Sequence, residues 1–566
     1  MSRHFRNGML ILLVLGWAAG ELQAQTPGPL CGGVPCVFQY RGSLAPGVAD
    51  SPTGAWVKEL ELADVDGDGW LDIYMMQKQP LVPQGGENVV QEGDNLDLLY
   101  RNQPSFVFAI DGDTAAEPNR LEGYFLLETT ATAFGDPFPT TRGYDAEILD
   151  MDGDPENNLD IVRIDTVGSL KILWGDGTGL FHDHTDLFTS PTLDPNKDCE
   201  LNFGSLTPEP PLKGGNYDDV DVADLDGDGD FDLLVANWQD CGTNLLFRNL
   251  AAQGSPRQFE WVNVPNLGSQ FTHSVSLGLV NNDPWVDALL SNGGPPLLLL
   301  GSGPFTFQTP VPFTQLASET LVPVADIVGD LPGDAVPDDV PDLNGDGLAD
   351  VVLASFNQMN VFFNNGSSTN PYPNRTLCNF NCISSGNYDA RYADLDGDGQ
   401  MEMVTVSITV GDSSNQPGNP SQPFVDPTDM KVYRVAGAGG TSFEDVTDEF
   451  LIASTFTGHQ GGIGVDLGDL DQDGDLDMVL GGAQDLSTPR GAVHFYENRT
   501  VGRLANRTVA SGAYLFEVLD TFTGASGATI TGTAQVTVEA GNEVILTDGF
   551  VAAPGSGGQF IARIRP

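Results

Sequence analysis

The residues of this chain best placed to do chemistry are aspartates that recur in short loops rich in glycine. In the most regular copies, acids stand at positions 1, 3, 5 and 9 of the loop, with glycine at positions 4 and 6. This spacing turns several carboxylates toward one point. Two unit charges 4 Å apart repel by about 4 kcal/mol at an effective dielectric of 20, so such a loop needs a cation. Calcium, which takes six to eight oxygen ligands, is the ion that the pattern predicts.

Six loops carry the pattern, and we expect the side chains at positions 1, 3, 5 and 9 and the carbonyl at position 7 to bind the ion. The first two contain Asp64, Asp66, Asp68, Trp70 and Asp72, and Asp150, Asp152, Asp154 and, after two inserted residues, Asp160. The next two contain Asp224, Asp226, Asp228, Asp230 and Asp232, and Asp342, Asn344, Asp346, Leu348 and Asp350. The last two contain Asp394, Asp396, Asp398, Gln400 and Glu402, and Asp469, Asp471, Asp473, Asp475 and Asp477. The sequence therefore predicts about five to six calcium sites.

A seventh copy of the loop, at residues 279–287, is eroded. Leu279 replaces the first acid, although Asp287 remains at position 9. We expect this copy to bind calcium weakly or not at all. The irregular intervals between the seven copies are those expected of one structural unit that carries insertions.

Short apolar runs flank the loops in a fixed order. One run precedes each loop, as at 57–62, a second follows it, as at 231–235, and a third comes after a further turn, as at 245–247. Apolar runs of this length, bounded by Gly, Asn and Asp, are typical of strands, and no segment shows sustained helical periodicity. Each unit is therefore predicted to be a four-stranded antiparallel sheet. Seven such sheets in a ring would make an all-β, seven-bladed β-propeller with few free edges.

These loops and their flanking strands resemble FG-GAP/VCBS repeats, which occur in the integrin α-subunit propeller and in many secreted bacterial proteins. The resemblance covers about residues 38–500. It implies a seven-bladed propeller with calcium in the loops of some blades. Three features depart from the family pattern: the insertion before Asp160, Leu279 at a first position, and Glu402 in place of a closing aspartate.

The chain divides into three predicted parts. Residues 1–24 have Arg3 and Arg6, an apolar run and a small residue at Ala24, as in a signal peptide, and residues 25–505 are the propeller. Residues 506–566 alternate small, β-branched and glycine residues and form a predicted small β module. Through Gly549, Phe550 and neighbouring positions, it resembles the stacked-β modules that end many secreted bacterial proteins. Such a module serves either surface retention or export sorting, or it is a folding cap.

The cysteines agree with export, because disulfides persist in oxidising compartments. No other stretch reaches the about 18 apolar residues that span a bilayer, so we expect no transmembrane segment and a secreted or cell-surface protein. Six cysteines allow 15 pairings, among which we favour pairs of sequence neighbours. The six are Cys31, Cys36, Cys199, Cys241, Cys378 and Cys382.

The overall charge of the chain argues against some classes of binding partner. The chain has 79 acidic and 24 basic residues, a net charge of −55, which argues against nucleic acid and anionic membranes. No hydrolase or zinc-protease motif is present. We therefore expect an adhesion or recognition protein that binds an extracellular protein or glycan through its loops. A carbohydrate-active enzyme such as a polysaccharide lyase, and a structural surface protein, are the alternatives.

A further set of acids stands five residues before the first loop position. We expect these acids either to bind a ligand or, more simply, to buttress the loops. They are Glu59, Asp145, Asp219 and Asp389.

Overall fold

The fold was obtained as a computed structural model, which describes somewhat more than half of the chain. The described residues are 3–5, 30–31, 34–35, 37–44, 56–78, 82–84, 87–89, 97–102, 110–111, 125–128, 143–154, 156–165, 170–188, 217–237, 244–265, 267, 272–281, 283–292, 296–313, 321–327, 342–355, 358–367, 371–372, 376–377, 387–407, 430–436, 442–451, 462–482, 493–504, 508–509, 513–518, 521–524, 528–531, 535–540, 543–546, 550–554 and 559–564.

Most of these residues belong to seven four-stranded antiparallel sheets. The first two sheets are β5 (Trp56–Ala63), β6 (Asp72–Lys78), β9 (Leu98–Asn102) and β11 (Phe125–Glu128), and β12 (Gly143–Leu149), β13 (Asp160–Asp165), β14 (Leu170–Gly175) and β15 (Phe181–Phe188). The next two are β16 (Tyr217–Ala223), β17 (Asp232–Asn237), β18 (Leu245–Asn249) and β19 (Phe259–Trp261), and β20 (Thr272–Gly278), β21 (Asp287–Asn292), β22 (Leu297–Leu299) and β25 (Val311–Pro312). The fifth and sixth are β26 (Leu321–Ile327), β27 (Val351–Ser355), β28 (Gln358–Phe362) and β29 (Thr376–Leu377), and β30 (Asn387–Ala393), β31 (Glu402–Ser407), β32 (Met430–Ala436) and β33 (Ser442–Asp445). The seventh is β34 (Gly462–Gly468), β35 (Asp477–Gly482), β36 (Val493–Asn498) and β4 (Phe38–Leu44).

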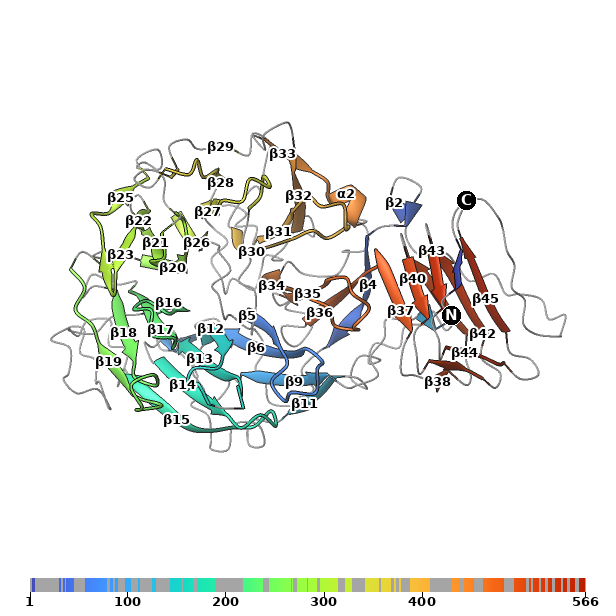
Figure 1. The fold of residues 1–566 in the computed structure, drawn as a ribbon, viewed down its shortest axis with the longest axis horizontal. Helices are drawn as coiled ribbons and strands as arrows, with labels where there is room; N and C mark the ends of the chain where they lie inside the picture. Colours follow the sequence, from blue (N-terminus) through green and yellow to red (C-terminus); the bar gives the residue numbers. More distant parts are fainter. Residues whose placement is uncertain are drawn as a thin grey trace.

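The sheets surround a common axis, with the first strand of each innermost (Figure 1). Each innermost strand contacts the innermost strand of the next sheet, and β34 of the last sheet contacts β5 of the first. Strand β4, from the N-terminal part of the chain, pairs with β36 and so supplies the outer strand of the last sheet. The all-β propeller predicted from the sequence is confirmed.

The hydrophobic core lies between neighbouring sheets. Trp174 of β14, Leu233 of β17 and Phe247 of β18 belong to one buried cluster that joins the second and third sheets. All six residues of β17 are buried, because another sheet covers each of its faces. This explains why the strands after the loops are continuous apolar runs and do not alternate between polar and apolar residues.

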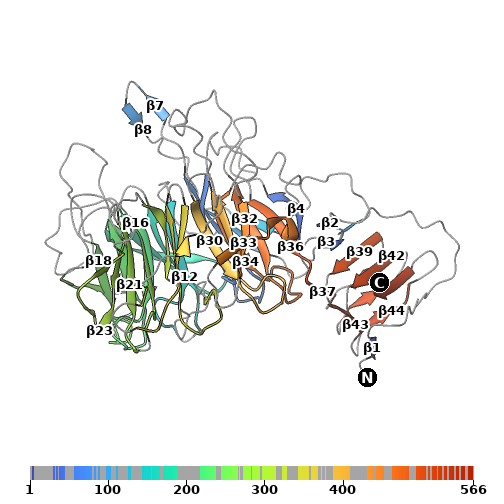
Figure 2. The same ribbon diagram turned by 90° about the horizontal axis from the view of Figure 1, so that it is seen from above.

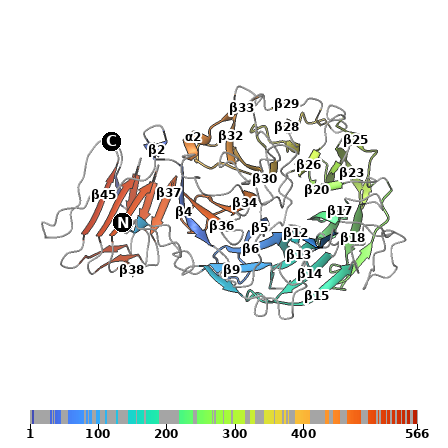
Figure 3. The same cartoon turned by 180° about the vertical axis from the view of Figure 1, so that it is seen from behind.

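The C-terminal strands form a separate parallel arrangement beside the ring (Figure 3). Three successive coils stack, so that equivalent strands pair in parallel register. The coils are β37 (Val501–Leu504), β38 (Thr508–Val509) and β39 (Ala513–Val518); β40 (Thr521–Gly524), β41 (Thr529–Ile530) and β42 (Gln535–Ala540); and β43 (Glu543–Leu546), β44 (Val551–Ala552) and β45 (Gln559–Ile564). Strand β37 begins before residue 506, where the sequence predicted the module to start.

One further strand and the cysteines belong to segments discussed above. Within the predicted signal peptide, β1 (Arg3–Phe5) pairs with β43, and the rest of residues 1–24 lies outside the described residues. The predicted disulfides cannot be placed, since the cysteine side chains also lie outside them. No helix in the described part of the chain is both long and apolar enough to cross a membrane.

Candidate metal centres

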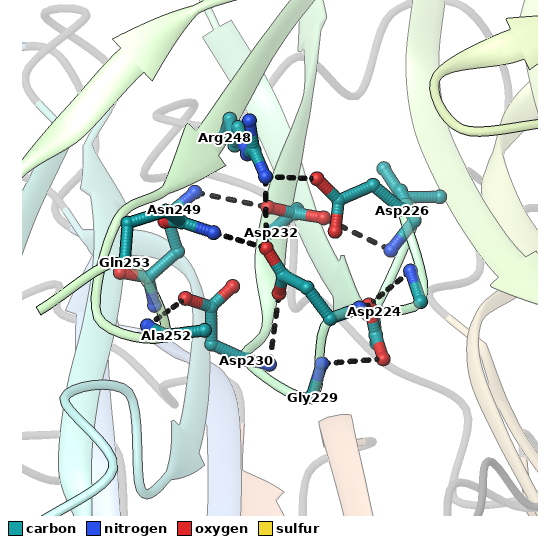
Figure 4. A network of polar contacts seen from close by, with 12 residues as sticks. Asp224, Asp226, Gly229, Asp230, Asp232, Arg248, Asn249, Ala252 and Gln253 are labelled. Atoms are coloured by element: carbon teal, nitrogen blue, oxygen red, sulfur yellow. Dashed lines mark hydrogen bonds and ion pairs between the residues drawn. The ribbon is translucent and has the colours of Figure 1, made fainter.

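Every aspartate loop joins the first strand of a sheet to the second. In the loop at 224–232, between β16 and β17, Gly227 and Gly229 have φ angles of 80° and 94°. A side chain at either position would be strained, which explains the glycines at positions 4 and 6. The tight turn brings the acids at positions 1, 3 and 9, which are Asp224, Asp226 and Asp232, toward one another (Figure 4).

The acid at position 1 holds the turn. Oδ1 of Asp224 accepts the N–H of Gly227 at 2.7 Å, and Oδ2 accepts the N–H of Gly229 at 3.0 Å. Asp64 and Asp469 accept the N–H of the glycine five residues on in the same way, at 2.7 and 3.0 Å. The loop geometry is therefore built from sequence-local hydrogen bonds that repeat along the chain.

The acid that ends each loop, which we call the closing acid, is buried and clamps the loop to the sheet. Oδ2 of Asp232 accepts the N–H of Leu225 at 2.9 Å, and Oδ1 accepts the N–H of Asn249, at the end of β18, at 2.9 Å. Burial raises the pKa of Asp232 to about 8. Asp287 of the eroded loop has the same pair of bonds, from Val280 and Gly301. The closing acid thus has a structural role that does not depend on a metal.

Acidic oxygens converge in five of the described loops. In each, one oxygen from each of three acids lies within 4.8 Å of the other two. Calcium–oxygen distances of about 2.3–2.6 Å place two ligands of one ion at most about 5 Å apart, so the clusters fit this ion. The clusters are Asp64, Asp66 and Asp72; Asp150, Asp152 and Asp154; Asp224, Asp226 and Asp232; Asp394, Asp396 and Glu402; and Asp469, Asp471 and Asp477.

Unsatisfied oxygens in these loops support a cation. Oδ1 of Asp152, Oδ1 of Asp226 and Oδ1 of Asp230 are buried and accept no hydrogen bond. Leaving buried acceptors unpaired costs about 1–3 kcal/mol each, more when they are charged. A hard cation bound to these oxygens removes that cost.

The structure groups three predicted side-chain ligands in each of five loops. The predicted position-5 ligands Asp68, Asp228, Asp398 and Asp473 lie outside these groups, and three loops differ further from the prediction. Asp230, predicted to act through its carbonyl, also has a buried side chain that accepts the N–H of Ala252 at 2.7 Å. In the loop at 150–160, the converging group leaves out Asp160, which accepts the N–H groups of Met151 and Gly175.

In the loop at 342–350, no three acids are grouped, because position 3 is an amide. The turn itself is the same as in the loop at 64–72. Asp342 Oδ1 and Asn344 Oδ1 accept the N–H of Asp346 at 2.8 and 2.9 Å, as Asp64 and Asp66 accept that of Asp68. At position 7, the N–H groups of Trp70, Leu348 and Gln400 each donate to the position-5 carboxylate of their own loop, at 2.8 to 3.0 Å. Asp475 does so to Asp473 at 3.2 Å.

Sequence reasoning missed the arginines beside the acids. A guanidinium reaches the position-3 carboxylate in four loops: Arg101 to Asp66, Arg257 to Asp152, Arg248 to Asp226, and Arg434 to Asp396. These arginines come from the third strand of the same sheet or, for Arg257, from the next sheet. The Arg-Asn pairs at 101–102 and 248–249 were the available signal in the sequence.

Asparagines at the ends of third strands link neighbouring loops. The side-chain amide of Asn249 donates to the carbonyl of Met151, in the loop of the preceding sheet, at 2.6 Å. The equivalent bonds run from Asn102 to Leu470, from Asn364 to Val280 and from Asn498 to Leu395, at 2.6 to 3.1 Å. These bonds link the aspartate loops of neighbouring sheets around the ring.

The acids that precede the loops join the innermost strands. Oδ2 of Asp145 accepts the N–H of Val220 at 2.8 Å, across the boundary between two sheets. Asp219 and Asp389 accept the N–H groups of Val275 and Val465 in the same way, at 2.7 and 2.8 Å. Of the two expected roles, the geometry favours buttressing, and the acids brace the next sheet more than the loop. The side chain of Glu59 lies outside the described residues.

The central strands also carry a basic residue. Arg391 of β30 forms ion pairs with Asp389 at 2.7 Å and with Asp466 of β34 at 3.4 Å, and Glu61 of β5 is 4.0 Å away. Asp466 in turn accepts the N–H of Leu62 at 2.8 Å. This cluster ties three sheets together near the axis.

Comparisons with known proteins identify the repeat. The sequence model described as "FG-GAP-like repeat" matches residues 342–405, from the fourth acid-rich loop to strand β31. No curated protein matches the chain.

Several solved structures resemble it at low identity. One is BBS1N in complex with ARL6DN, with 8% identity and a TM-score of 0.39, covering 82% of this chain and 97% of that chain. A Bacillus licheniformis rhamnogalacturonan lyase has 10% identity and a TM-score of 0.40, covering 82% and 76%. An Agrocybe aegerita lectin that recognises non-reducing terminal N-acetylglucosamine has 14% identity and a TM-score of 0.33, covering 70% and 81%.

Proposed function

Because this chain is an FG-GAP-repeat β-propeller, we propose that it is a secreted calcium-binding protein that recognises an extracellular protein or glycan. The observation that carries the calcium step is the convergence of three acidic oxygens in each of five loops. Bound calcium supplies the positive charge that these carboxylates lack. In the loop at 224–232, the ion would be held by Asp224, Asp226 and Asp232, with Asp230 adding a buried carboxylate.

Calcium would then stabilise the ring more than it would act on a substrate. A ligand that binds only the folded state adds about 2.7 kcal/mol at a hundredfold excess over its Kd, and several sites add together. Extracellular modules bind calcium with Kd values of about 10⁻⁴–10⁻³ M, so sites of this class fill where free calcium exceeds about 1 mM. The signal-peptide pattern of residues 1–24 supports a location outside the cell.

Recognition is assigned to the insertions between repeats, since loops on a rigid scaffold commonly carry binding residues. The insertion after the first loop contains a hairpin of β7 (Val82–Gln84) and β8 (Glu87–Val89), which projects from the ring in Figure 2. The net charge of −55 favours partners that are neutral or positively charged.

Counting bound metal and melting the mature protein test the calcium step. We expect about five to six calcium ions per chain and a large fall in melting temperature when EDTA removes them. A chain that contains no calcium and melts at the same temperature in EDTA would show that the loops are simple turns.

Glycan and protein arrays, probed in calcium and again in EDTA, test the recognition step. We expect binding that requires calcium and is lost when the hairpin at 82–89 is replaced by a Gly-Ser turn of equal length. No binding in either buffer would favour a structural surface protein. Turnover of an acidic polysaccharide would instead establish an enzyme.

A further inference from the structure

An arginine accompanies the acid at position 3 in four metal loops. Arg101 Nη1 lies 3.0 Å from Asp66, and Arg257 Nε lies 2.8 Å from Asp152. Arg248 of β18 contacts two acids of the loop at 224–232: it lies 2.6 Å from Asp226 (Figure 4) and 2.9 Å from Asp228.

Arg434 also contacts two acids, Asp396 and the closing acid Glu402. Each of the four guanidiniums therefore lies on a carboxylate that is a predicted calcium ligand.

In six of the seven loops, an arginine is present where position 3 is an acid and absent from the register position where it is an amide; the loop at 469–477, with Asp471 at position 3, is the exception. Arg101, Arg248 and Arg434 occupy one register position on the third strand, opposite the closing acid. Where position 3 is an amide, at Asn344 and Asn281, the residue at this register is apolar: Phe363 and Leu300.

In the loop at 150–160, an arginine also contacts the position-3 acid, but this arginine does not come from the third strand of the same sheet. The register position holds Trp174, and Arg257 comes from the next sheet, with its guanidinium 5.1 Å from the centre of the Trp174 ring. In the loop at 469–477, this register position holds Glu497, so we assign no arginine to that loop.

The guanidiniums are held in place by more than the carboxylates. Arg248 lies 5.9 Å from the ring of Phe305, and Arg434 lies 5.6 Å from the ring of Phe450. Arg257 has a φ angle of 63°, a backbone conformation that persists in a non-glycine residue only when its surroundings impose it. Arg101 Nη1 also donates to the carbonyl of Thr178 at 3.0 Å. These contacts hold the four arginines beside their loops.

We propose that these arginines are built-in counter-cations, which hold the loop acids together when calcium is absent and lower the calcium affinity of the loop. This inference rests on the proposed calcium binding. A guanidinium about 6 Å from a divalent ion, near water, weakens binding by about tenfold. The same charge lowers the repulsion among the acids in the metal-free loop. The arginine therefore lowers the calcium affinity of the loop and raises the stability of the metal-free protein. This combination suits a protein that meets abundant calcium only after export.

The loop at 64–72 allows a test at a single site, because Trp70 can sensitise the luminescence of terbium bound in place of calcium. Calcium affinity is measured by displacing terbium, and metal-free stability by melting in EDTA. For Arg101→Met, we expect the calcium affinity of this loop to rise about tenfold and the metal-free melting temperature to fall. Arg101→Lys keeps the charge and should leave both close to those of the wild type.

The controls separate this inference from the function on which it rests. Trp174 lies beside the loop at 150–160 and can sensitise terbium there, so the signal of the loop at 64–72 is the part that Trp70→Phe removes. Arg563→Met, which changes an exposed arginine of the C-terminal module, should leave that part unchanged. If Arg101→Met lowers the affinity or leaves it unchanged, the arginine orients ligands or has no role, and the inference is wrong although calcium binding stands. If the wild type binds neither terbium nor calcium, the proposed function itself fails. Arg101→Gln replaces Arg101→Met if the latter does not fold.

Discussion

Removing a closing acid should destabilise the protein even in a loop that binds no metal. Asp287 of the eroded loop is completely buried, and its two oxygens accept the N–H groups of Val280 at 2.9 Å and Gly301 at 2.7 Å. Asp287→Ala leaves both buried amides unpaired. At about 1–3 kcal/mol for each unpaired group, the free energy of unfolding should fall by about 2–6 kcal/mol.

Asp232→Ala provides the matched comparison, since Asp232 makes the same two bonds in a loop with converging acids. Urea unfolding in EDTA, followed by tryptophan fluorescence, should show similar losses for both variants. With calcium at a hundredfold excess over its Kd, Asp232→Ala should lose up to about 2.7 kcal/mol more, and Asp287→Ala should not. If Asp287→Ala is as stable as the wild type in EDTA, the closing acids do not hold the loops to the sheets and act only as metal ligands.

Three further predictions concern the closing acids as a set, the links between loops and a buried ion pair. Burial raises the pKa of several closing acids to about 7 or 8, so the folded, metal-free protein retains protons that the unfolded chain releases above about pH 4. The free energy of unfolding of the metal-free protein should therefore fall as pH rises from 4 to 8, while the calcium affinity rises. A melting temperature in EDTA that is higher at pH 8 than at pH 5 would contradict this. Asn364→Ala removes the bond to the carbonyl of Val280 and should cost about 1–3 kcal/mol in urea unfolding, whereas Asn365→Ala, at an exposed neighbour, should stay within about 0.5 kcal/mol of the wild type. Arg163→Met leaves Asp97, 2.8 Å away and equally buried, without its counter-charge and should cost about 3–5 kcal/mol; a double variant with Asp97→Asn that recovers none of the loss would show that the charge is not the cause.

The repeated loop and the strands around it were predictable because both depend on residues close in sequence. Gly227 and Gly229 take positive φ angles, and Asp224 accepts N–H groups three and five residues away. These local requirements appear directly as the spacing of acids and glycines. The continuous apolar runs after the loops likewise predicted buried strands, and the sheets confirm them.

Sequence alone also placed the closing acids among the ligands, but it did not reveal their second role. The amide that binds Asp232 from β18 belongs to Asn249, and the retained Asp287 shows that this bond is kept where the rest of the loop is eroded. The use of β4 to complete the last sheet was likewise not predicted, since no local pattern marks a strand as belonging to the other end of the chain.

What the sequence by itself determined is the repeating unit: an acidic loop between two apolar strands, with the spacing of a calcium site and a net charge that calls for cations. The tertiary structure decided which groups from elsewhere meet that loop. Arg257 reaches Asp152 from the next sheet, and Asn364 reaches the carbonyl of Val280 in the preceding one. Hydrogen bonds within a turn follow from spacing along the chain. Ion pairs and clamps between sheets depend on how the ring packs, which local spacing does not encode.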